Sequence, residues 1–183
     1  MLKSVFGPFL FDTSAESWLE RSTDAAVRRW HADYLRLQPM QVSAVTVTER
    51  IRGYAMLLER AAPRERAGIS FIRDAYLSAR RQVVPVGREV AFVAGELAAM
   101  LPQPPTAPKR AHRTAETRQE RMVRWRYDIL IAATSLAAGL TLVHFNPQDF
   151  ETIRMAIETS SERLPGVGPL NLVNVIRLAV TYP

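Results

Sequence analysis

Four carboxylates stand at the ends of apolar runs that lie far apart in the sequence. They are Asp12 after PFLF, Glu49 after VSAVTVT, Asp128 before ILIAATSL and Asp149 after LTLVHFNPQ, with Asn146 shortly before the last. An unpaired buried charge costs several kcal/mol, so such acids are paired, solvated in a cleft or bound to a metal. Four acids brought together would supply the oxygen ligands that Mg²⁺ and Mn²⁺ prefer. A single Asp at a strand end is more often a turn residue or a helix cap, so only the set predicts a metal site.

Length and composition predict one soluble domain over residues 1–183. A chain of 183 residues with 48% hydrophobic content can bury one sizeable core. The absence of cysteine excludes disulfides and thiolate metal sites and fits the reducing cytoplasm. The longest apolar run, residues 129–143, is shorter than the roughly 20 residues of a membrane span. We therefore expect a cytoplasmic protein that is not inserted in a membrane.

The charge balance favours an anionic partner. The net charge is +6, and all but two of the 24 basic residues are arginine, which contacts phosphate through two parallel hydrogen bonds. Genomic base composition also produces such a bias, so the charge supports nucleic acid binding without establishing it. The run RQERMVRWRYD at residues 118–128 is either an RNA contact or a solvated helix face. Trp18 and Trp30 are interpreted as core or dimer packing, and Arg52 as a phosphate contact or a solvated residue.

Apolar segments and helical patterns alternate along the chain. Strands are expected at 8–11, 40–46, 82–86 and 140–144, with helices between them and an edge strand in 170–180. Thr13 or Ser14 is the expected cap of the first helix. This order predicts an α/β fold, a three-layer α/β/α sandwich with a mostly parallel central sheet. The proline-rich stretch 102–117 is expected to be an exposed excursion, and residues 165–183 an extended tail.

Three segments resemble the motifs of the PIN-domain family, above all its VapC-like ribonuclease toxins. FLFDTS is similar to the family's first strand, and VTVTERIRGYAML is similar to its helix with Glu, Arg and Gly. DILIAATSLAAGLTLVHFNPQDF resembles the third and fourth motifs, and the likeness extends over about residues 7–163. His144 stands where the family commonly has Thr. Asn146 occupies the fourth acidic position, so either Asp149 completes the site or the site has three carboxylates.

The resemblance implies a metal-dependent endoribonuclease that is the toxin of a toxin–antitoxin pair. It implies hydrolysis of RNA by water activated with Mg²⁺ or Mn²⁺, a cognate antitoxin partner and a homodimer. The implied catalytic residues are Asp12, Glu49, Asp128, Asn146 and Asp149, and the implied metal ligands are the four acids among them.

Two other functions remain open from the sequence. A PIN-like module with weak catalysis would act through RNA or protein contacts, although the presence of Asp12, Glu49 and Asp128 together speaks against it. A Mg²⁺-dependent phosphatase or DNA nuclease on another α/β fold is disfavoured because the sequence has no Gly-rich phosphate loop.

Overall fold

The computed structural model describes residues 7–107, 116–160 and 162–180 as strands and helices in alternation. The strands are β1 (Phe9–Phe11), β2 (Met40–Ser43), β3 (Arg81–Val84), β4 (Thr141–His144) and β5 (Leu172–Asn174). The helices are α1 (Thr13–Arg21), α2 (Ala25–Leu37), α3 (Ala44–Arg60), α4 (Pro63–Ser78), α5 (Arg88–Met100), α6 (Arg118–Ala137), α7 (Pro147–Thr159) and α8 (Val175–Val180).

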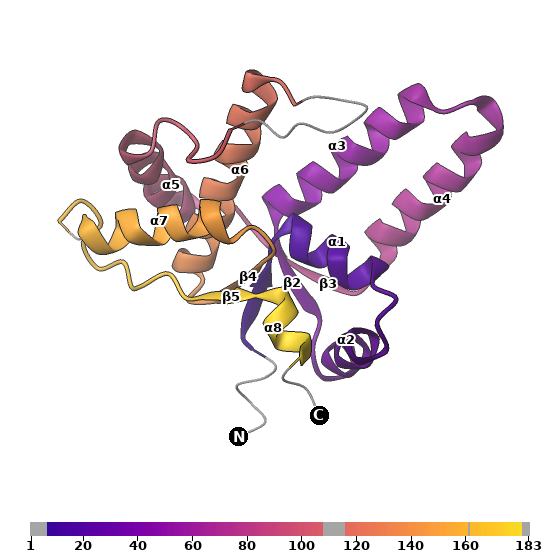
Figure 1. The fold of residues 1–183 in the computed structure, drawn as a ribbon, viewed down its shortest axis with the longest axis horizontal. Coiled ribbons are helices and arrows are strands. Elements are labelled where there is room, and N and C mark those ends of the chain that lie inside the picture. Colours follow the sequence, from indigo (N-terminus) through magenta and orange to yellow (C-terminus); the bar gives the residue numbers. More distant parts are fainter. Residues whose placement is uncertain (1–6, 108–115, 161, 181–183) are drawn as a thin grey trace.

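The five strands form one parallel sheet in the order β3-β2-β1-β4-β5. Leu10 of the central strand β1 lies beside Gln41 of β2 and Leu142 of β4. Helices cover both faces of the sheet, and the α3–α4 hairpin projects from one side of the molecule (Figure 1). The expected three-layer α/β/α sandwich is therefore confirmed, and the sheet is parallel throughout.

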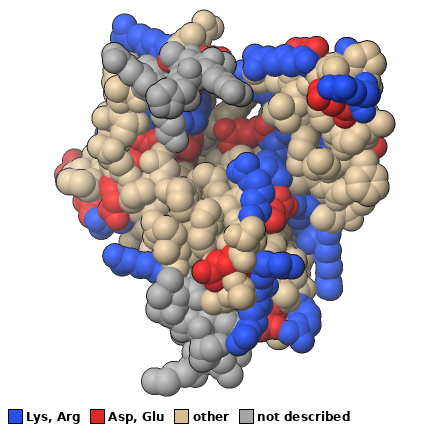
Figure 2. All heavy atoms as spheres, turned by 45° about the vertical axis from the view of Figure 1, so that its right-hand side comes forward, with Lys and Arg blue, Asp and Glu red and all other residues tan. Residues whose placement is uncertain are grey.

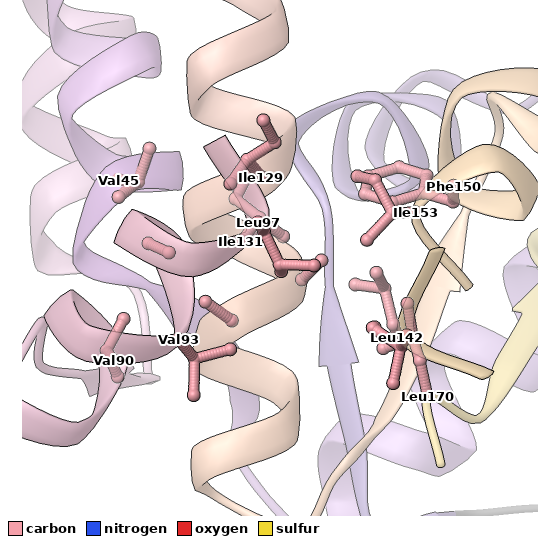
Figure 3. Packing of buried hydrophobic residues seen from close by; sticks show 14 of the residues in the cluster. Val45, Val90, Val93, Leu97, Ile129, Ile131, Leu142, Phe150, Ile153 and Leu170 are labelled. Atoms are coloured by element: carbon pink, nitrogen blue, oxygen red, sulfur yellow. The ribbon is translucent and has the colours of Figure 1, made fainter. Parts of the chain in front are cut away.

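The alternation of side chains along the central strands divides the core in two. Leu10 points to the face covered by α5, α6 and α7, where Leu97, Ile131 and Phe150 pack together (Figure 3). Phe9 and Phe11 point to the opposite face, which α1, α2 and α8 cover. Because all three residues of β1 are buried, β1 is held on both sides, and the residue that follows it is positioned firmly.

Three helix boundaries differ from the sequence expectation because polar side chains cap helices locally. Asp12, and not Thr13 or Ser14, is the N-cap of α1. The Ser43 side chain accepts a hydrogen bond from Val45 N, so α3 begins at Ala44 although Val and Thr follow, and the expected strand 40–46 ends early. At the C-terminal end Asn174 Oδ1 accepts from Ile176 N at 3.0 Å. The expected edge strand is present as β5, but the chain then turns into α8, so the prediction was wrong for the residues after Asn174.

The first half of the proline-rich segment, residues 102–107, is largely exposed, as expected, but Thr106 ties it to the domain. Leu101 O accepts a hydrogen bond from Trp125 Nε1 at 2.9 Å, and Thr106 is hydrogen-bonded to Arg121 and Asp149. Residues 108–115 of the expected excursion and residues 181–183 of the expected tail lie outside the described residues. Within the described ranges, no helix has the length and apolar character required to cross a membrane.

Candidate active site

One cleft collects residues from four distant segments near the carboxyl ends of β1 and β4. Its volume is about 670 Å³, and Asp12, Glu49, Asp128 and Asn146 all line it. Asp12 follows β1, Glu49 lies in the second turn of α3, Asp128 lies in the middle of α6 and Asn146 follows β4. Figure 2 shows a hollow in the upper half of the molecular face with acidic atoms in it and basic side chains around it. Ligand sites of open parallel sheets lie at this edge.

Asp12 is held by the helix that it caps. Its Oδ1 accepts from Ala15 N at 2.6 Å, and its Oδ2 accepts from the Ser14 hydroxyl at 2.7 Å. Asp12 is only 4% exposed, and this burial raises the pKa of its carboxyl to about 7. The two hydrogen bonds lower the pKa, whereas the nearby charge of Glu49 raises it. Asp12 is therefore fixed in orientation, and its negative form lacks full compensation from the protein.

Glu49 is tied to the same helix across the cleft. The hydroxyl of Thr13, the residue after Asp12, donates a short hydrogen bond to Glu49 Oε2. Burial raises the pKa of the Glu49 carboxyl, although Thr13 and the charges of Arg124 and Arg52 oppose the shift. Thr13 thereby joins α1 to α3 and sets the position of Glu49 relative to Asp12.

Asp128 carries the least compensated carboxylate of the cleft. Its Oδ2 is buried and has no hydrogen-bond partner among the described residues. Burial raises the pKa of Asp128 well above its usual range, and the charges of Asp12, Asp149 and Glu49 raise it further. A buried oxygen without a donor is costly in a folded protein unless something occupies the space in front of it.

The donor set suits a hard divalent cation. Burial raises the pKa of all three carboxyls, and one of them has an unpaired buried oxygen; a divalent cation stabilises such groups in their charged form. Within the part of the chain that the structure describes, however, no three Asp, Glu or His side chains are grouped tightly enough to hold one ion. Binding would therefore use water bridges, which Mg²⁺ commonly retains, or rotation of a carboxylate.

Asp149 has a different environment from the other three acids. It is fully buried, does not line the cleft and forms an ion pair with Arg121 Nη2 at 2.8 Å. It also accepts hydrogen bonds from the Thr106 hydroxyl at 3.1 Å and from the Asn146 side-chain amide. Its charge is thus compensated within the protein, while Asn146 reaches both the cleft and this pair.

Sequence reasoning missed Arg121 and Thr106 as parts of this buried cluster. Arg121 is 1% exposed and donates from Nε to Thr106 O and from Nη2 to the Thr106 hydroxyl. The spacing of Arg121, Trp125 and Ile129 along α6 gave a usable signal, because residues four apart share one helix face. An arginine on the same helix face as Trp125 and Ile129 is expected to be buried with them and not exposed to solvent.

The basic run at the start of α6 divides into three environments. Arg121 and Trp125 are buried, Arg118 and Arg126 are exposed, and Arg124 lines the cleft. Arg124 pairs with Glu116 at 3.0 Å, and its charge lowers the pKa of Glu49 and Asp128. Only Arg124 of this run is therefore placed to meet a ligand of the carboxylates.

The remaining sequence candidates lie outside the carboxylate group. Arg52 is exposed and does not line the cleft. His144 is buried against Phe150, and burial lowers the pKa of its imidazole to about 4, so it is neutral. Trp30 is fully buried in the core beside Tyr34, whereas Trp18 lines the cleft.

Comparison with known proteins gives structural likeness without sequence likeness. No protein-family model matches the sequence, and no curated protein matches it significantly. Among solved structures, the chain is similar to one in VapBC2 from Rickettsia felis bound to a promoter DNA fragment, with 16% identity and a TM-score of 0.57. That match covers 91% of this chain and 97% of the other.

Two further solved structures give the same result. DNA-bound VapBC from Salmonella typhimurium matches with 19% identity and a TM-score of 0.54, covering 91% of this chain and 97% of the other. FitAcB from Neisseria gonorrhoeae matches with 20% identity and a TM-score of 0.55, covering 92% and 98%. The protein thus has the PIN-like fold of a chain found in each of these complexes.

Proposed function

We propose that the protein is a metal-dependent endoribonuclease and the toxin component of a toxin–antitoxin pair. The observation that carries the proposal is the convergence of Asp12, Glu49 and Asp128 in one cleft, with the buried Asp128 Oδ2 unpaired. The PIN-like fold agrees with it, and the solved structures with that fold are of complexes named VapBC and FitAB. The choice of RNA as the substrate rests on the sequence resemblance to VapC-like toxins.

The carboxylates would bind a divalent cation in the cleft. Bound Mg²⁺ or Mn²⁺ lowers the pKa of a coordinated water and offsets charge on phosphate oxygens. Asp12, Glu49 and Asp128 would hold it, directly or through water. Asp12 is oriented by Ala15 N and Ser14, and Glu49 by Thr13, so two of the three carboxylates need little reorganisation when a substrate binds.

Arginines at the cleft would attract the RNA backbone. Arg124 and Arg21 both line the cavity, and the net charge of the chain is +6. A guanidinium beside the acids counters the repulsion that a phosphate would meet there. Arg124 is paired with Glu116, so phosphate binding would exchange one anionic partner of Arg124 for another.

A homodimer and a cognate antitoxin are the protein partners that we propose. The α3–α4 hairpin exposes Leu57, Phe71, Ile72 and Leu77, each more than half exposed. Large exposed apolar side chains that lie near one another are typical of protein–protein contacts. A short reading frame for a DNA-binding protein beside this gene would support the toxin role.

Cleavage of a mixed RNA pool with Mn²⁺ and with EDTA tests the enzymatic function. The proposal predicts internal cleavage of RNA that depends on the metal and is absent with EDTA. Binding of RNA without cleavage would favour the alternative, a catalytically weak PIN-like module. Faster cleavage of a DNA substrate would contradict RNA as the preferred substrate.

A further inference from the structure

Two aromatic side chains from separate segments meet at the edge of the carboxylate cleft. Trp18 of α1 and Phe145 of the β4–α7 connection both line the cavity, with ring centroids 6.1 Å apart and ring planes inclined by 25°. Phe145 directly precedes Asn146. The aromatic pair and the carboxylates therefore belong to one continuous cavity.

Helix α1 explains why Trp18 faces the acids. Ser14, Ser17, Trp18 and Arg21 all line the cleft and follow the spacing i, i+3, i+4 and i+7, which is one face of a helix. The same helix starts at Asp12, so one rigid element carries a carboxylate, an aromatic ring and a cation in that order along the cavity. The Arg21 Nε donates to Ser17 O at 3.0 Å, which holds this arginine along α1.

The pair differs from the buried aromatic residues of the core. Trp30 and Trp125 are 0% and 1% exposed, and Phe150, five residues after Phe145, is fully buried. Phe145 instead is 41% exposed at the cleft. Packing of the core thus accounts for Trp30, Trp125 and Phe150, whereas it leaves the Phe145 ring open to a ligand.

We infer that Trp18 and Phe145 form a stacking site for a nucleobase of single-stranded RNA bound in the cleft. This inference rests on the proposed ribonuclease function and specifies its substrate as an unpaired segment. Every nucleobase has a flat π face that stacks on an aromatic ring, whereas bases inside a duplex are already stacked on each other. With the charge of Asp12, Glu49 and Asp128 offset by a cation, Arg21 and Arg124 in the same cavity favour a polyanion over an uncharged aromatic peptide as the occupant.

Tryptophan fluorescence gives a direct readout, because Trp18 is the one tryptophan that is not fully buried. The experiment titrates full-length Asp128→Asn protein in Mn²⁺ with a short oligoadenylate, and this substitution limits cleavage during the measurement. Stacking predicts quenching of the Trp18 emission, loss of that quenching in Trp18→Phe, and a Kd raised about fivefold or more by Phe145→Leu. Phe92→Leu is the matched control, because Phe92 is 54% exposed on α5 and does not line the cleft.

A second test changes the oligonucleotide and leaves Trp18 and Phe145 in place, so it does not depend on whether an aromatic variant folds. An oligonucleotide of the same length with abasic sites should bind more weakly by a similar factor, and duplex RNA should leave the emission unchanged. Equal Kd values for intact and abasic strands, or an unaltered Kd in Phe145→Leu, would overturn the stacking site. Quenching by an antitoxin-derived peptide, with none by RNA, would reassign the pair to protein binding and also overturn it.

Failure of the stacking site and failure of the ribonuclease function give different results. If the unsubstituted protein and Phe145→Leu cleave single-stranded RNA with equal KM, only the stacking site is wrong. If the unsubstituted protein neither binds nor cleaves RNA with Mn²⁺ present, both inferences are wrong.

Discussion

Replacing Asp128 with Asn removes one negative charge from the cleft while side-chain size stays nearly constant. Asp128 Oδ2 is buried without a hydrogen-bond partner, and the charges of Asp12, Asp149 and Glu49 raise the pKa of its carboxyl. The charged form is therefore destabilised by burial and by like charges together. A purely structural Asp in the middle of a helix would show neither feature.

The expected effects on activity and on stability have opposite signs. If Asp128 holds the cation, RNA cleavage should fall at least about 100-fold, which is typical for loss of one preorganised electrostatic group. Without metal, the free energy of unfolding should stay equal or rise by about 1 kcal/mol or more at pH 7.5 because repulsion is relieved. For a chain of this size, each kcal/mol shifts Tm by about 2–4 °C.

Both quantities are measured on one preparation of Asp128→Asn, by cleavage of labelled RNA and by thermal unfolding in EDTA. Asp74→Asn is the matched control, because Asp74 is an exposed acid of α4 that does not line the cleft. It should change neither quantity. Full RNA cleavage by Asp128→Asn, or a clear loss of its stability in EDTA, would refute the catalytic assignment.

Three further predictions address the metal, the pH and the buried ion pair. Millimolar Mn²⁺ should raise Tm above its value in EDTA, because a ligand of the native state stabilises it, and equal values would count against a preformed site. Since the pKa of Asp12 is raised from 3.8 to about 7 in the folded state, the metal-free protein should lose stability as pH rises from about 4 to about 7, by on the order of 4 kcal/mol from this group. Unfolding of Asp12→Asn at several pH values should show a smaller loss, and an identical pH profile would contradict the shift. Arg121→Met should destabilise the protein by about 3–5 kcal/mol in urea unfolding, because Asp149 would stay buried without its partner, and the exposed Arg126→Met is the control.

The sequence could predict the parallel sheet and the approach of Asp12 to Asn146. Both residues follow apolar strands, and the ends of parallel strands meet at one edge of the sheet whatever the details of packing. Glu49 could be placed there because α3 begins at the same edge, whereas Asp128 lies in the middle of α6 and the start of that helix does not fix its position. Their hydrogen bonds could not be predicted, because the Thr13–Glu49 contact depends on how α1 packs against α3.

The ends of elements were harder to predict than their existence. Apolar β-branched residues continue past Ser43 and past Asn174, and these residues indicate strand. In both places a polar side chain accepts a hydrogen bond from the backbone two residues later and begins a helix. Such a bond depends on one rotamer, which the hydrophobic pattern does not reveal.

The ion pair between Arg121 and Asp149 explains how one cleft region holds so many acids. Asp149 is close enough to raise the pKa of Asp128, yet its own charge is balanced by Arg121 and by two hydrogen bonds. The negative charge without a buried partner is thereby confined to Asp12, Glu49 and Asp128. A divalent cation would balance two of these three charges, so the metal site that we propose uses these three carboxylates, and Asn146 links the cleft to the buried pair. Arg121→Met should then lower RNA cleavage indirectly, through Asp149 and Asn146. The Arg121→Met protein should also lose more stability than a variant with a substitution at any of the three cleft acids.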